Sequence, residues 1–224
     1  MKVEYKIEEV KPNIFAVIIE NQYDRAMTFC RAQEYYESPN AKFRGKTFDM
    51  FDYMKWYSEE DDKGFSYGSD WSGFNIPLKT AWECYFKLKE YQTPYDEIMY
   101  KIVSSIEGKM FNKRNTRNWK GYIIGAGNTD GWTFKHEVCH GLWNTNKEYQ
   151  SMAVDGISAI DIEHYNIFKD NLIKMGYTDS VIDDEIQAYL CFGHTNYNFS
   201  KGVNSDIVDK YHNAFTITLN EFIK

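Results

Sequence analysis

The order in which strand-like and helix-like patterns follow one another most constrains the fold of this chain. Alternating apolar and polar residues at Val3–Val10 and the β-branched run Ile14–Glu20 predict a hairpin around the turn Lys11-Pro12-Asn13. Short strands are also expected at Phe65–Tyr67 and Tyr122–Ala126. After residue 130 the periodicity is helical almost to the end. Strands early and helices late predict an α+β fold with a small N-terminal mixed sheet.

The predicted helices are separated by turn residues, with Gly176 and Gly193 placed where helices end. They are Gln22–Glu37, a helix from its N-cap Thr47 through Ser58, Pro77–Leu88, Thr93–Ile106, Asp130–Trp143, Lys147–Ile160, Asp161–Met175, Thr178–Phe192 and Ser205–Phe222. We expect a single domain with a strand-containing lobe over 1–128, a helical lobe over 129–224, and a cleft where the two meet.

The charge balance argues against a nucleic-acid partner. The chain has 26 basic and 33 acidic residues, which give a formal net charge of −7. Nucleic-acid-binding surfaces need clustered cations, and the densest cluster here, Lys109–Lys120, is expected to be a solvated loop. The sequence carries no signal for an oligomeric state.

The four cysteines indicate a reducing compartment. Cys30, Cys84, Cys139 and Cys191 lie far apart and form no CxxC pair, so we expect buried thiols and no disulfide framework. The N-terminus lacks the apolar core of a signal peptide, and no apolar run approaches the ~20 residues that span a bilayer. These features predict a cytoplasmic protein that is not bound to a membrane.

The segment His136-Glu137-Val138-Cys139-His140 is an HExxH motif. On a helix, His136 and His140 share a face and both imidazoles can reach one metal ion. The intervening Glu137 lies about 100° round the helix axis, within reach of a water on that metal. The plainer interpretation is an amphipathic helix whose histidines are ordinary polar neighbours of a packed apolar face.

A catalytic zinc site needs a third protein ligand. Glu163 and Glu185 both follow the motif. The residues three and four positions from Glu185 are all apolar, so its carboxylate is expected to face the core, where it requires a partner such as a metal. Glu163 lies on a boundary face that leaves it in water. We therefore predict His136, His140 and Glu185 as the ligands of Zn²⁺.

HEVCHGLW followed by DDEIQAY resembles the two-helix signature of the gluzincin metallopeptidases, over residues 132–190. This resemblance implies a zincin-like fold, zinc ligands at His136, His140 and Glu185, and Glu137 as general base. Some gluzincins carry an acidic residue four positions after the glutamate ligand, where this chain has Tyr189. Asp184 or a backbone carbonyl must then hold a histidine ring. The whole chain also resembles uncharacterised virus- or phage-encoded proteins.

These features predict zinc-dependent hydrolysis of a peptide or protein substrate. Tyr122–Ala126 is the candidate sheet edge that pairs with an extended substrate. His194 is the first candidate for stabilising the oxyanion, with other candidates at Tyr197, Tyr211 and His212. A surface histidine in a loop is the plainer interpretation of His194.

The alternative function is a catalytically inactive zincin-like fold that binds a peptide or a partner protein. Trp56, Trp71, Trp82 and Trp119 suit either a binding groove or packing anchors. The chain contains no phosphate-binding loop and no GxSxG elbow. Peptide deformylases use a cysteine ligand in an upstream motif, and Cys84 has no such context.

Overall fold

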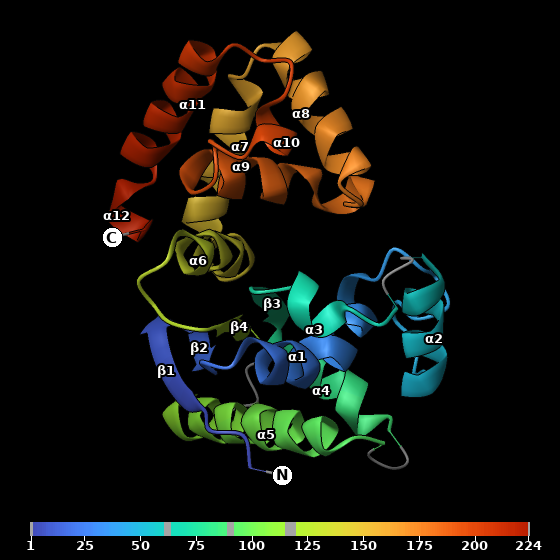
Figure 1. Cartoon of the computed structure of the whole chain (residues 1–224). Coiled ribbons are helices and arrows are strands. Elements are labelled where there is room, and N and C mark those ends of the chain that lie inside the picture. Colours follow the sequence, from blue (N-terminus) through green and yellow to red (C-terminus); the bar gives the residue numbers. More distant parts are fainter. Residues whose placement is uncertain (1, 61–63, 89–91, 115–119, 224) are drawn as a thin grey trace. The chain divides into compact units, whose positions relative to one another are not determined.

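The computed structural model describes residues 2–60, 64–88, 92–114 and 120–223. The chain divides into two compact units, Met1–Thr129 and Asp130–Lys224, here called the sheet unit and the helical unit. The sheet unit contains β1 (Lys6–Lys11), β2 (Ile14–Ile18), α1 (Gln22–Glu37), α2 (Met50–Glu60), α3 (Tyr67–Asp70), β3 (Phe74–Pro77), α4 (Leu78–Phe86), α5 (Pro94–Arg114) and β4 (Tyr122–Ala126) (Figure 1).

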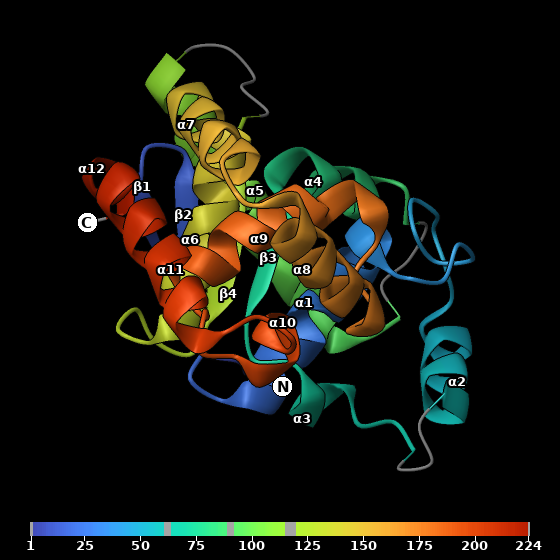
Figure 2. The same cartoon turned by 90° about the horizontal axis from the view of Figure 1, so that it is seen from above.

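The helical unit contains α6 (Trp132–Thr145), α7 (Lys147–Ser158), α8 (Ile162–Lys174), η1 (Asp179–Val181), α9 (Ile182–Cys191), α10 (Tyr197–Ser200), α11 (Ser205–Thr218) and α12 (Asn220–Ile223). α9 is its central helix, because it contacts α6, α7, α8 and α11 (Figure 2). Strands confined to the first unit and helices in both confirm the α+β prediction.

The described strands form one mixed sheet in the order β1-β2-β4-β3. β1 and β2 are the predicted hairpin, whose turn residue Asn13 has φ 68°. β2 pairs with β4 in parallel, and β3 pairs with β4 antiparallel. β4 is therefore an interior strand whose backbone is paired on both sides. The prediction that Tyr122–Ala126 offers a free edge to a substrate is wrong, since β1 and β3 are the edge strands.

Local signals explain the best-predicted helix. α1 has the predicted bounds because Asn21 accepts a hydrogen bond from the Asp24 amide at its start and the chain reaches Pro39 just after its end. α1 lies so close to β4 that a Cβ on Gly125 would approach the ring of Phe29 to 2.6 Å. The glycine thus permits this close contact between helix and strand.

Several predicted bounds in the sheet unit differ from the structure. Phe65–Tyr67 is not a strand. The sheet contains instead β3, which was not predicted as a strand. α2 begins after Asp49, whose carboxylate accepts from the amides of Phe51 and Asp52, so Asp49 caps the helix in place of Thr47.

The basic cluster Lys109–Lys120 was expected to be a loop, but α5 continues through Arg114. Residues 115–119, including Trp119, lie outside the described residues. Of the other predicted anchors, Trp56 and Trp82 pack against the core of the sheet unit, whereas Trp71 is 46% exposed.

All four cysteines are free and buried, as predicted. Within the described part of the chain, no helix combines the length and the apolar character needed to cross a membrane.

Candidate metal centre

Two packed helices of the helical unit bring the predicted ligands together. α6 carries His136 and His140 one turn apart, and α9 carries Glu185. The candidate ligand atoms of these three side chains all lie within 4.8 Å of one another, and all three side chains are buried. This His–His–Glu group could hold a metal ion.

The three side chains present their ligand atoms to one another at short range. The Nε2 atoms of His136 and His140 are 3.2 Å apart. His136 Nε2 lies 3.7 Å from Glu185 Oε2, and His140 Nε2 lies 3.6 Å from Glu185 Oε1. Glu163, the alternative ligand, is exposed in the first turn of α8. The structure thus gathers the predicted trio and leaves Glu163 in solvent.

Each imidazole is held through its other nitrogen. His136 Nδ1 lies 3.0 Å from the Phe192 carbonyl oxygen, and His140 Nδ1 lies 2.9 Å from Asp184 Oδ1. A carbonyl oxygen only accepts hydrogen bonds, so the Nδ1 of His136 donates, and an ionised Asp184 requires the same of His140. The prediction that Asp184 or a backbone carbonyl holds a ring is confirmed, with one of each.

With these tautomers, several polar atoms of the group lack a hydrogen-bond donor or a positive charge beside them. In two neutral rings that donate from Nδ1, both Nε2 atoms carry lone pairs, and these lie 3.2 Å apart. Glu185 Oε2 is buried without a hydrogen-bond partner among the described residues. An unpaired buried carboxylate is costly. A cation shared by the three side chains satisfies all of these atoms together.

The local potential is negative. Burial is the strongest influence on the pKa of His140 and lowers it, but the charges of Asp184, Glu185 and Glu137 outweigh it and raise this pKa well above the usual value. A site that favours a proton on an imidazole also favours a metal cation in its place.

A glycine shapes the turn that presents the Phe192 carbonyl. α9 ends at Cys191, and Gly193 follows with φ 138°. A Cβ at this position would lie 3.1 Å from the ring of Tyr189 and 3.8 Å from Nδ1 of His136. Gly193 was predicted only as a helix end, but it also leaves room for the ring of Tyr189, which packs on His136.

Glu137 lies between the two histidines in the sequence of α6 and is 7% exposed. Its charge acts on two tyrosines as well as on His140. Burial raises the pKa of Tyr189 to about 12, and the charges of Glu185 and Glu137 add to the rise. Burial also raises the pKa of Tyr177, again with contributions from both glutamates. The Glu137 carboxylate therefore belongs to the same buried environment as the ligands.

Two aromatic rings pack on His136. The ring of Tyr189 meets it edge-to-face with centroids 4.7 Å apart, and its hydroxyl lies 3.3 Å from that of Tyr177. The indole of Trp132, one turn earlier on α6, meets His136 at 6.4 Å and is 59% exposed. Sequence reasoning missed both contacts, although Trp132 precedes His136 by four residues, the spacing of neighbours on a helix.

His194, the first oxyanion candidate, is not part of the ligand group. Its ring stacks on His212 with centroids 3.7 Å apart, and its Nε2 lies 3.7 Å from Asp209. Burial and then the neighbouring His212 lower the pKa of His194. The ring of His212 is in turn held by the Leu190 carbonyl, 2.7 Å from its Nδ1.

The two remaining oxyanion candidates also lie in other surroundings. Tyr197 is 69% exposed, with the Lys201 ammonium over its ring. The Tyr211 hydroxyl lies 2.9 Å from Nδ1 of His164, which makes His164 a hydrogen-bonded, half-buried histidine.

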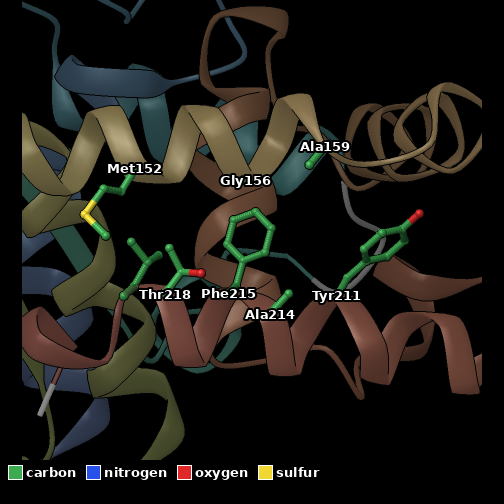
Figure 3. A pocket seen from close by; sticks show the side chains of 8 residues that line it. Met152, Gly156, Ala159, Tyr211, Ala214, Phe215 and Thr218 are labelled. Atoms are coloured by element: carbon green, nitrogen blue, oxygen red, sulfur yellow. The ribbon is translucent and has the colours of Figure 1, made fainter.

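Tyr211 also lines a cavity of about 300 Å³ between α7 and α11, where the Phe215 ring points from α11 towards Gly156 on α7 (Figure 3). None of the residues that line this cavity is a candidate ligand.

Comparisons with known proteins give no match to a family model, a curated protein or a solved structure.

Proposed function

We propose that this chain is a zinc-dependent peptidase of zincin-like fold, with His136, His140 and Glu185 as the zinc ligands. The observation that carries the proposal is the buried group of two imidazole Nε2 atoms and one carboxylate, whose atoms lie 3.2 to 3.7 Å apart.

The spacing is compatible with zinc. Tetrahedral zinc with nitrogen and oxygen ligands at about 2.0–2.2 Å requires its ligand atoms to lie about 3.3–3.5 Å from one another. The two Nε2 atoms lie 3.2 Å apart, close to this range, and each lies 3.6–3.7 Å from a different oxygen of the Glu185 carboxylate. Two histidines and a glutamate are also a donor set that catalytic zinc sites use, and three protein ligands leave a fourth position open for water or substrate. A closed structural site would have used a fourth side chain.

Zinc at this site would supply a Lewis acid that activates water and polarises the carbonyl of the substrate. Glu137 then has the role of general base: it takes a proton from the attacking water and returns it to the leaving amine nitrogen. The charge of Glu137 acts on His140 together with those of Asp184 and Glu185, so Glu137 lies in the same buried acidic environment.

The oxyanion needs a hydrogen-bond donor beside the ligands. Tyr189 suits this role better than His194, because its ring contacts His136 while the ring of His194 contacts His212. Tyr189 keeps its proton at neutral pH, since burial raises its pKa to about 12. The substrate class we propose is a peptide or an unfolded protein.

The proposal is tested with the purified protein and an unfolded substrate, reduced and alkylated casein. We expect cleavage that stops when 1,10-phenanthroline removes zinc and returns when zinc is added back. 1,7-Phenanthroline, an isomer whose two nitrogens cannot chelate one metal ion, is the matched control and should leave the rate unchanged. A zinc-loaded protein that cleaves no unfolded substrate, or cleavage that zinc removal does not affect, would contradict the proposal.

A further inference from the structure

A continuous chain of hydrogen bonds connects α7 to the imidazole of His140. The Tyr149 hydroxyl donates to Gln187 Oε1 at 2.5 Å, and Gln187 Nε2 donates to Asp184 Oδ1 at 2.9 Å. The same Asp184 oxygen lies 2.9 Å from Nδ1 of His140. Gln187 follows Asp184 by three residues on α9, a spacing at which side chains on a helix meet. Tyr149 and Gln187 are fully buried.

The chemistry of each group fixes which atom donates and which accepts at each step of this hydrogen-bond chain. The tyrosine hydroxyl has a single proton, and when it donates that proton to Gln187 Oε1 it turns the amide NH₂ towards Asp184. The carboxylate of Asp184 accepts from Gln187 and from His140 Nδ1. The proton of His140 is thereby fixed on Nδ1, and the lone pair on Nε2 faces the ligand group.

From this geometry we infer that Gln187 and Tyr149 are positioning residues for the metal centre. They hold Asp184 in the orientation that fixes the tautomer of His140, which is the second of the two proposed histidine ligands. The inference rests on the proposed metal function of the site. His136 does not depend on this chain, since the Phe192 backbone carbonyl holds its ring. The two histidines are therefore held in different ways, and the hydrogen-bond chain orients only His140.

Because the hydrogen-bond chain is buried, the replacement of one of its side chains disturbs the others. No bulk water reaches Gln187 or Tyr149 to replace a lost partner. If the Tyr149 hydroxyl is removed, the amide of Gln187 is free to turn over and present its oxygen to Asp184. Two acceptors then face one another, and the carboxylate moves from His140.

The test measures zinc affinity by competition with a chromophoric chelator, which requires no catalysis. Removing outer hydrogen-bond partners of metal ligands commonly weakens metal binding by 10–100-fold, and we expect about tenfold for Gln187→Met and somewhat less for Tyr149→Phe. Tyr149→Phe keeps the ring and its volume, so it reports on the hydroxyl even if Gln187→Met folds poorly. The absorption spectrum of the cobalt-substituted protein should change in both variants.

Tyr211→Phe is the matched control, because it also removes a hydrogen-bonded tyrosine hydroxyl in the helical unit, whose partner is His164 and not a residue of the ligand group. Its zinc affinity and cobalt spectrum should equal those of the wild type. A double-mutant cycle then shows whether Gln187 acts through Asp184. Adding Gln187→Met to Asp184→Asn should cause no further loss of affinity.

The inference is overturned if both variants bind zinc as tightly as the wild type, or if Gln187→Met costs the same affinity with and without Asp184. A wild-type protein that binds no zinc overturns the inference together with the proposed function. The expected losses of affinity in a protein without peptidase activity support the inference and reject only the proposed activity.

Discussion

Replacing Glu137 by glutamine should abolish peptide hydrolysis while leaving zinc in place. General acid–base catalysis by a positioned side chain contributes roughly 10²–10⁴-fold, and we expect the turnover rate to fall by about that factor. Glutamine has nearly the same size and shape, so it fits the same buried position on α6, but its amide cannot take a proton from water. Turnover on a fluorogenic peptide, with zinc content measured on the same sample, checks this prediction.

Glu148→Gln is the matched control, since Glu148 is an exposed residue in the first turn of α7. It should hydrolyse the peptide at the wild-type rate. If Glu137→Gln retains zinc and remains as active as Glu148→Gln, Glu137 is not the general base.

Replacing Glu185 by alanine should remove the stabilisation that zinc gives to the folded protein. A ligand present at a thousand times its dissociation constant stabilises the native state by about 4 kcal/mol, which corresponds to a rise of roughly 8–16 °C in Tm for a chain of this length. In the variant, two histidines remain to bind the metal, and the charged oxygen donor is lost. We expect zinc to shift the Tm of the wild type strongly and that of Glu185→Ala little, in thermal unfolding with and without added zinc.

Glu163→Ala provides the comparison, because Glu163 was the other glutamate that followed the motif and lies exposed on α8. It should keep the full zinc-dependent shift. The ligand assignment is wrong if Glu163→Ala loses this shift and Glu185→Ala keeps it.

The parts of the fold that were predicted well have strong local signals. α1 and β4 have the predicted bounds, since a capping residue and a following proline mark the helix and flanking glycines mark the strand. β3 was missed because it has only four residues and is defined by its pairing with β4. The same kind of non-local pairing decides which strands form the edges of a sheet. For this reason the sequence could not place β4 in its interior.

The candidate metal ligands were predictable because helical spacing is a local property. His136 and His140 lie on one face of α6, and the apolar neighbours of Glu185 required that its carboxylate face the core. The groups that hold the ligands are harder to infer. The Phe192 carbonyl has no sequence signature, and Tyr149 reaches Gln187 from 38 residues away.

His194 illustrates the limit of placing loop residues by proximity along the chain. It follows the end of α9 by three residues, but Gly193 precedes it with φ 138°, a backbone conformation that sequence spacing does not reveal. This torsion helps to set the direction in which the chain continues after α9. The ring of His194 consequently stacks on His212 and does not join the ligand group.

The central claim is that His136, His140 and Glu185 bind one zinc ion, and elemental analysis of the purified protein tests it most directly. After dialysis against zinc-free buffer, we expect about one equivalent of zinc per chain in the wild type. His136→Ala and His140→Ala should each lose it, with the fold checked by circular dichroism. A folded wild type that holds no more zinc than these two variants would contradict the account.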